Sequence, residues 1–80
     1  MSDGYSFGKA DQKQPIESKT FSSSLVDQAQ YDPNTQTLEV TLNSGRSYTV
    51  QAFSPAEWSA FQNAWSAGRF FNDVIRHREV

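Results

Sequence analysis

The sequence predicts an α+β domain in which a three-stranded antiparallel β-meander is followed by two short helices packed on one face. Three observations lead to this prediction. Polar turn sequences separate short runs of strand-forming residues, a Ser-Pro-x-Glu signal begins a helix, and a glycine follows that helix. Because such a sheet has one apolar face, the apolar stripe of a helix is needed to cover it.

Residues 1–21 precede these signals, and we expect them to form a flexible N-terminal arm, with the folded domain over residues 22–80. The arm is rich in Ser, Gly, Lys, Gln and Asp and has no periodic apolar residues. It therefore has little apolar surface to offset the entropy cost of ordering. A second interpretation uses Tyr5 and Phe7, whose rings could dock on a partner or on the domain itself.

The first two strands are predicted from Leu25 to Tyr31 and from Thr37 to Leu42. The first run does not alternate strictly, which indicates a bulge. The second run alternates apolar and polar residues, as a half-buried strand does. Between them, Asp32 can bond the backbone two residues on and Pro33 presets φ, so a tight turn joins the strands.

The third strand is predicted from Arg46 to Gln51, after a reversal at Asn43–Gly45 that gives a glycine for a positive φ. Tyr48 and Val50 would share one face of this strand. A three-stranded sheet leaves two open edges, and we expect these to accept an added strand or a second copy of the chain.

The start of the first helix is predicted from a capping box. Ser54 is the expected N-cap, Pro55 suits the first helical position, and Glu57 completes the box. Phe53 and Trp58 have the spacing of a hydrophobic staple across this helix start. The helix should therefore begin sharply, directly after the third strand.

The body of the first helix is expected to carry one apolar stripe, formed by Trp58, Phe61 and Trp65, toward the core. Gly68 is the predicted stop of this helix. A short second helix should follow Gly68. Residues 77–80 should then form a frayed tail. The second helix is indicated by two apolar pairs at i,i+4 spacing, Phe70 with Val74 and Phe71 with Ile75.

Composition narrows the function classes. The 80 residues include six Phe, three Tyr and two Trp, so aromatic rings must supply much of the core. The net charge of -2 argues against strong nonspecific binding to duplex DNA. The absence of Cys and the single His exclude thiolate and multi-His metal sites, so we expect no metal or cofactor. No apolar run reaches membrane-spanning length, and we expect no membrane partner.

The order of these elements resembles the KTSC domain, a short module found alone in bacterial and phage proteins and at the C-terminus of some lysyl-tRNA synthetases. The resemblance covers about Ser22 to Val80. One departure concerns the family's central Tyr-x-Tyr, which is Tyr48-Thr49-Val50 in this sequence. The matching residues are the serines at 22–24, Tyr31-Asp32, Leu38-x-Val40, Ser44-Gly45, Tyr48, the Pro55 helix start and Ser66-x-Gly68-x-Phe70-Phe71-Asn72-x-x-Ile75-Arg76.

The resemblance implies a small binding module, and RNA binding has been suggested for the family. Arginines beside aromatic residues suit such a surface, because guanidinium groups hold phosphates and rings stack on bases. The alternative interpretation is ordinary solvated arginines around buried rings. Under the binding hypothesis the contributing residues are Arg46, Tyr48, Arg69, Asn72 and Arg76.

Two further function classes stay open. A phage or bacterial protein-interaction module could dock on a host protein through a sheet edge or the arm, and a counter-defence protein could capture a small nucleotide. We predict no enzyme, because no nucleophile, metal ligand set or phosphate loop accompanies the carboxylates of Glu57 and Asp73. The expected location is the cytoplasm of a bacterial cell or of a phage-infected host.

Overall fold

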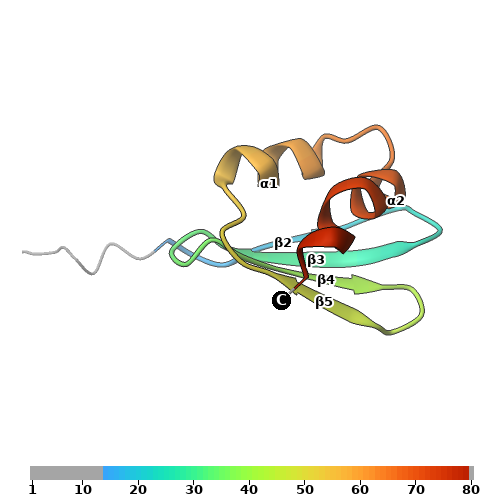
Figure 1. Ribbon diagram of the computed structural model, residues 1–80, viewed down its shortest axis with the longest axis horizontal. Coiled ribbons are helices and arrows are strands. Elements are labelled where there is room, and N and C mark those ends of the chain that lie inside the picture. The colour runs from blue at the N-terminus through green and yellow to red at the C-terminus, as the bar shows by residue number, and fades with distance from the viewer. Residues whose placement is uncertain (1–13, 80) are drawn as a thin grey trace, which may run out of the picture.

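A computed structural model describes residues 14–79 and shows a four-stranded antiparallel sheet with a helical layer on one face (Figure 1). The strands lie side by side in chain order. They are β2 (Glu17–Thr20), β3 (Val26–Asp32), β4 (Thr37–Leu42) and β5 (Ser47–Val50). The helical layer comprises α1 (Pro55–Gln62), α2 (Ala67–Phe70), the π-helical segment η1 (Phe71–Ile75) and the 3₁₀ segment η2 (Arg76–Arg78).

The α+β class and the antiparallel meander are confirmed, but the predicted number of three strands is wrong. The additional strand, β2, comes from residues 17–20 of the predicted arm and pairs antiparallel with β3. All its side chains are exposed, so no apolar alternation marks it in the sequence. Backbone pairing holds it at the sheet edge, and Trp58 Nε1 donates to Glu17 Oε1 at 2.8 Å. Tyr5 and Phe7 lie outside the described residues, so the predictions for them stay predictions.

The predicted bulge and turns are present. The β3–β4 register shifts between Val26 and Gln28. In the following turn, Asn34 N donates to Asp32 Oδ1 at 2.9 Å, the side-chain bond predicted for this aspartate. Gly45 has φ of +93° in the β4–β5 turn, a value that glycine adopts without strain.

The capping box at the start of α1 is confirmed in both directions. Ser54 N donates to Glu57 Oε1 at 2.9 Å, and Glu57 N donates to Ser54 Oγ at 3.1 Å. Phe53 and Trp58 are both buried, as the staple spacing predicts. Both pack on the Tyr31 ring, with centroid distances of 6.2 Å for Phe53 and 5.2 Å for Trp58.

The predicted apolar stripe is only partly correct. Trp58 and Phe61 are buried, but Trp65 is 95% exposed. The reason is that α1 ends at Gln62, so residues 63–66 leave the helical path before Trp65 could reach the core. Two rings that the stripe did not include cover Phe61 instead: Phe21 stacks on it at 4.7 Å and Phe70 at 5.1 Å.

The prediction that Gly68 ends the first helix is wrong, because α1 ends at Gln62 and Gly68 belongs to α2. It lies in the first turn of α2, where Ser66 is the N-cap and its Oγ accepts from Arg69 N at 3.2 Å. A Cβ at Gly68 would lie 3.4 Å from Leu25 Cβ and 3.5 Å from Ser23 Oγ. At this glycine, α2 therefore packs against the loop before β3 at ordinary van der Waals distance.

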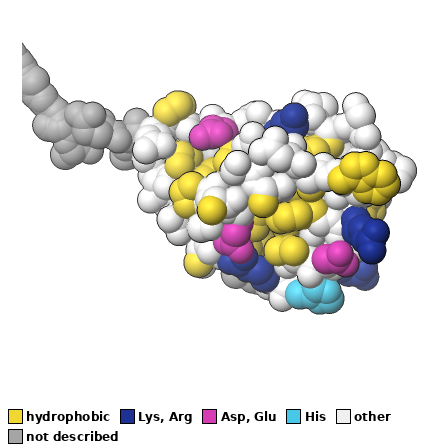
Figure 2. Space-filling view, turned by 90° about the horizontal axis from the view of Figure 1, so that it is seen from above, with side chains coloured by type: hydrophobic (Ala, Val, Ile, Leu, Met, Phe, Trp, Pro, Cys, Tyr) yellow, Lys and Arg dark blue, Asp and Glu magenta, His cyan; other side chains and the backbone are white. Residues whose placement is uncertain are grey.

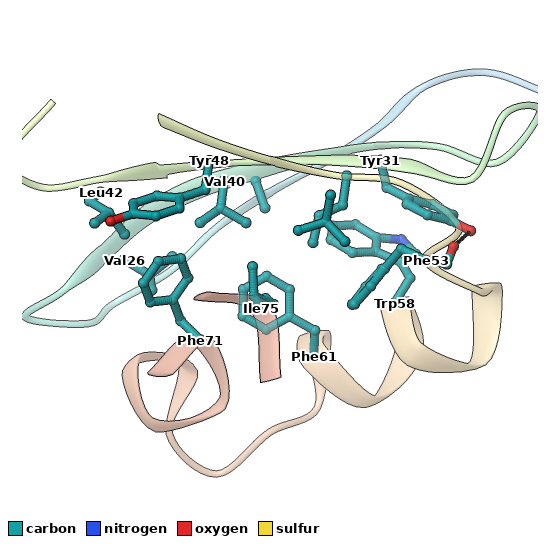
Figure 3. Packing of buried hydrophobic residues seen from close by; sticks show 13 residues of the cluster. Val26, Tyr31, Val40, Leu42, Tyr48, Phe53, Trp58, Phe61, Phe71 and Ile75 are labelled. Carbon is teal, nitrogen blue, oxygen red and sulfur yellow. Dashed lines mark hydrogen bonds between the residues drawn. The ribbon is translucent and has the colours of Figure 1, made fainter. Parts of the chain in front are cut away.

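The core lies between the sheet and the helical layer (Figure 3). Phe71 and Ile75 point into it from η1, which confirms one of the predicted i,i+4 pairs as buried. Tyr48 and Phe71 face each other across the two layers in Figure 3. The buried hydrophobic residues are Val26, Ala29, Tyr31, Leu38, Val40, Leu42, Tyr48, Val50, Phe53, Trp58, Phe61, Phe71 and Ile75.

Arg78 and Glu79 contact the domain, whereas a frayed tail was expected from residue 77 onward. Arg78 forms an ion pair with Glu57, and its Nη2 donates to the Ala52 carbonyl at 2.8 Å. Glu79 makes a single antiparallel bridge to Val50 at the β5 edge. The tail therefore closes the corner between β5 and α1 with ionic and backbone contacts, which an apolar pattern in the sequence does not indicate.

Candidate binding surface

Tyr48 is a core residue beneath Arg46. Its ring is 8% exposed and packs edge-on against Phe71, with the centroids 4.9 Å apart. The Arg46 guanidinium lies 5.0 Å from the Tyr48 ring centroid, on the same side of the sheet as the helices. The Tyr48 ring is therefore not available as a stacking platform, although Arg46 itself is exposed.

Arg69, Asn72 and Arg76 are exposed and lie on α2, η1 and η2, respectively. Arg76 Nη1 donates to Asn72 Oδ1 at 3.3 Å, so the Asn72 side chain orients this arginine. Arg69 Nε lies 3.9 Å from Asp73 Oδ2, in a pair whose side chains are 75% and 67% exposed. The structure thus brings these three predicted residues together and places Arg46 and Tyr48 at a separate point.

In the part of the chain that the structure describes, the sheet face away from the helices offers no aromatic platform. Its outward side chains on β2 to β5 are Ser, Thr, Gln, Asp or Glu, because the two strand tyrosines, Tyr31 and Tyr48, point into the core. Proteins that bind RNA on an open sheet present aromatic rings there. Among residues 14–79, the large aromatic side chain that is exposed, Trp65, lies on the side of the helices.

On the side of the molecule that carries the helices, Trp65 lines the surface hollows beside α1 and α2. It forms a wall of two surface hollows. The larger, of about 520 Å³, is the serine hollow and is lined by Lys19, Ser22–Ser24, Gln62 and Trp65 among others. The smaller, of about 310 Å³, is the α2 groove, lined by Trp65, Ser66, Arg69, Phe70 and Asp73.

The charged side chains are unevenly placed. On the outward sheet face, Asp32 and Glu39 are not accompanied by a basic residue of the described strands. On the other side, Glu17, Glu57 and Asp73 each lie against a donor, namely Trp58, Arg78 and Arg69. Figure 2, which looks onto the helical layer, shows Lys or Arg side chains beside an exposed hydrophobic side chain at one end. The described basic residues, all on this side, are Lys19, Arg46, Arg69, Arg76 and Arg78.

Among the described residues, Glu57 and Tyr31 have shifted pKa values, and both side chains bond to other parts of the fold. The pKa of Glu57 lies below its ordinary value, chiefly because the Ser54 backbone N–H donates to it and also because Arg78 is its ion partner. Burial raises the pKa of the Tyr31 hydroxyl, and the Glu17 carboxylate adds to the effect. The Tyr31 hydroxyl donates to the Phe53 carbonyl. Neither group lines the two hollows beside Trp65.

Within residues 14–79, no group of three His, Asp or Glu side chains is placed to hold a metal ion. The same residues contain no helix with the length and apolar character needed to cross a membrane.

Sequence reasoning missed Trp65 as a surface residue, because its spacing from Trp58 and Phe61 matches a core stripe. One signal was available. Ser66 is a good N-cap residue and would begin a new helix, which requires the first helix to have ended before Trp65. The predicted glycine stop concealed this earlier break.

The fold and this surface define a small α+β domain, with a four-stranded meander covered on one side by short helices. Comparison with known proteins assigns the family: the KTSC domain matches residues 22–78, and the chain belongs to the KTSC domain family. The crystal structure of a KTSC domain protein from Yersinia pestis superposes with a TM-score of 0.74 and 27% sequence identity, covering 82% of this chain and 93% of that one.

A curated relative is an uncharacterized protein of Stutzerimonas stutzeri (strain A1501). It is 44% identical over 46 residues, a match that covers 58% of this chain and 65% of the relative. The chain therefore matches less than two thirds of that protein's length. The family match and the crystal structure give the family and the fold, and what the domain binds is a matter for proposal.

Proposed function

We propose that this protein is a non-enzymatic binding module for single-stranded RNA and that the ligand lies on the helical side. The observation that carries the proposal is the exposed Trp65 with a cation at each hollow, Lys19 at one and Arg69 at the other. Single-stranded nucleic acids are bound by this combination, because bases stack on rings and phosphates pair with cations.

The predicted site residues take different roles in this proposal. Arg69 and Arg76 contact phosphates, and Asn72 holds Arg76 through the bond to its Oδ1. Arg46 extends the cationic side, supported by the Tyr48 ring beneath it. We propose the cytoplasm of a bacterial cell or of a phage-infected host as the location, because RNA is available there.

The absence of catalysis is part of the same proposal. A catalytic group needs a pKa matched to its task and a position in a cleft. The carboxylate of Glu57 is engaged by Ser54 and Arg78, and the Tyr31 hydroxyl is engaged by the Phe53 carbonyl. This arrangement supports a structural role for both groups.

The test is fluorescence anisotropy with a labelled single-stranded RNA, titrated at several salt concentrations. We expect the double variant Arg69→Ala/Arg76→Ala to bind more weakly and to lower the slope of log K against log salt by about 1.4, from about 0.7 for each lost phosphate contact. The variant Lys9→Ala/Lys13→Ala is the matched control, since it removes two positive charges from the predicted arm. Equal affinity and slope in wild type and the Arg69→Ala/Arg76→Ala variant would contradict the proposal.

A second candidate function, docking on a host protein, is favoured by the exposed edge of β2. This strand has no neighbour on its outer side among residues 14–79, and its side chains are exposed. An extended segment of a partner, or β2 of a second copy, could add to the sheet there. Light scattering gives the oligomeric state, and pull-down of a host protein that survives deletion of residues 1–13 would support edge docking over docking through the arm.

A further inference from the structure

Folding leaves the exposure of Trp65 unexplained. The ring is 95% exposed, and the core is complete without it because Phe21 and Phe70 stack on the two sides of Phe61. Single exposed apolar residues are common on protein surfaces. Trp65 differs from such a residue because its side chain lines two hollows, each of which is also lined by a cationic residue, Lys19 in one and Arg69 in the other.

The serine hollow has the size of a small-ligand site. Its volume of about 520 Å³ falls within the range of about 300–1,000 Å³ for such sites, whereas the α2 groove, of about 310 Å³, is at the lower limit. The serine hollow is lined by the Trp65 side chain and by the loop that leads from β2 to β3. A planar group could enter with one face against the indole.

The polar groups of the serine hollow suit a nucleotide. Ser23 Oγ accepts from the backbone N–H groups of Leu25 and Val26, so its own proton is left for donation. Ser66 Oγ accepts from Arg69 N in the same manner. Lys19 adds an ammonium group at the side of β2. Hydroxyl donors and one cation around an aromatic wall match a base, a sugar and a phosphate.

We infer that Trp65 is the stacking platform of this surface and that the serine hollow receives one nucleotide of a single-stranded RNA. This inference rests on the proposed function. The base stacks on the indole face that lines the serine hollow, and the ribose and its phosphate contact the serine hydroxyls and Lys19. The chain of the RNA passes over Trp65 to the α2 groove, where Arg69 pairs with the next phosphate.

The experiment compares Trp65→Ala, Trp65→Phe and wild type by anisotropy with a labelled single-stranded RNA. Stacking on an aromatic residue contributes enough that Trp65→Ala should weaken binding about 10- to 100-fold. Trp65→Phe, which keeps a ring, should restore most of the affinity. Ile16→Ala is the matched control, since Ile16 is a large apolar side chain that is 60% exposed and lines a hollow with Asp32 and Glu39.

Tryptophan fluorescence gives an independent readout of contact. RNA should quench part of the wild-type emission and none of the Trp65→Phe emission, because Trp58 is only 4% exposed. Circular dichroism and thermal unfolding of Trp65→Ala should match wild type, as expected for an exposed side chain.

The outcomes separate the inference from the function on which it rests. Wild-type affinity in Trp65→Ala, with weak binding in Arg69→Ala/Arg76→Ala, would overturn the role of Trp65 and leave RNA binding in place. Absence of RNA binding by wild type at low salt would overturn the proposed function itself. Quenching by adenosine monophosphate as strong as by RNA would overturn the assignment to a strand and support capture of a free nucleotide at Trp65.

Discussion

Replacing Glu57 with glutamine separates two contributions of one side chain to stability. The Glu57 carboxylate accepts from Ser54 N at 2.9 Å and forms an ion pair with Arg78. Glutamine also completes a capping box, so Glu57→Gln keeps the first interaction and removes the charge from the second. The difference between the two proteins therefore measures what the negative charge of Glu57 contributes through the bond from Ser54 N and through the ion pair with Arg78.

The expected magnitude lies between two limits. Exposed ion pairs contribute about 0.2–1 kcal/mol, and hydrogen bonds to charged groups contribute about 1.5–3 kcal/mol. The side chains of Arg78 and Glu57 are 32% and 36% exposed, so solvent screens the pair partly. We expect Glu57→Gln to lower the free energy of unfolding by about 1 kcal/mol at pH 7, which for a domain of this size lowers Tm by about 4–8 °C.

The loss should depend on pH. Because folding lowers the pKa of Glu57, its ionic contribution is complete above the ordinary glutamate pKa of about 4.3 and is lost as pH falls through the lower, folded value. Urea unfolding of both proteins, followed by tryptophan fluorescence at pH 7 and in steps below pH 4, tests this. An equal difference at every pH, or no difference at pH 7, would refute the ionic account.

Three other substitutions test the fold. Phe61→Ala removes a fully buried ring and should cost about 3–5 kcal/mol in urea unfolding; a loss below 1 kcal/mol would contradict its central position. Tyr31→Phe should cost about 1–3 kcal/mol, since the Phe53 carbonyl loses its buried donor, and an unchanged urea midpoint would show that the bond contributes nothing. Ala52→Gly should stabilise by up to about 1 kcal/mol, because Ala52 has φ of +56°; a lower Tm than wild type would disprove relief of strain.

The sequence predicted the elements whose signals are local. The Ser54 capping box, the Asp32 turn and the alternation along β4 depend on residues a few positions apart, and the structure contains all three. The resemblance to the KTSC domain drew on the same elements and is confirmed over residues 22–78.

The features that were missed depend on contacts between distant residues. The polar β2 strand is held by its pairing with β3 and by the bond from Trp58 to Glu17, 41 positions apart. Phe21 had no periodic neighbours, yet it takes the place beside Phe61 that the helical pattern gave to Trp65. Trp65 was expected inside and is 95% exposed, whereas Tyr48, a predicted site residue, is 8% exposed.

Basic side chains lie on the helical side of the domain, and Asp32 and Glu39 lie on the other side of the sheet. The net electrostatic attraction of the domain for a polyanion should therefore depend on ionic strength. A helix with its side chains is about 10–12 Å thick, and the Debye length is about 10 Å at 0.1 M salt. At 0.1 M salt, a single-stranded RNA bound over Arg69 would be screened from the carboxylates of Asp32 and Glu39 on the far side of the sheet. At 0.01 M the Debye length reaches about 30 Å, so the strand also experiences those carboxylates and the net charge of -2. This domain should therefore gain less affinity on the final dilution of salt than a uniformly basic one, and the plot of log K against log salt should flatten at its low-salt end.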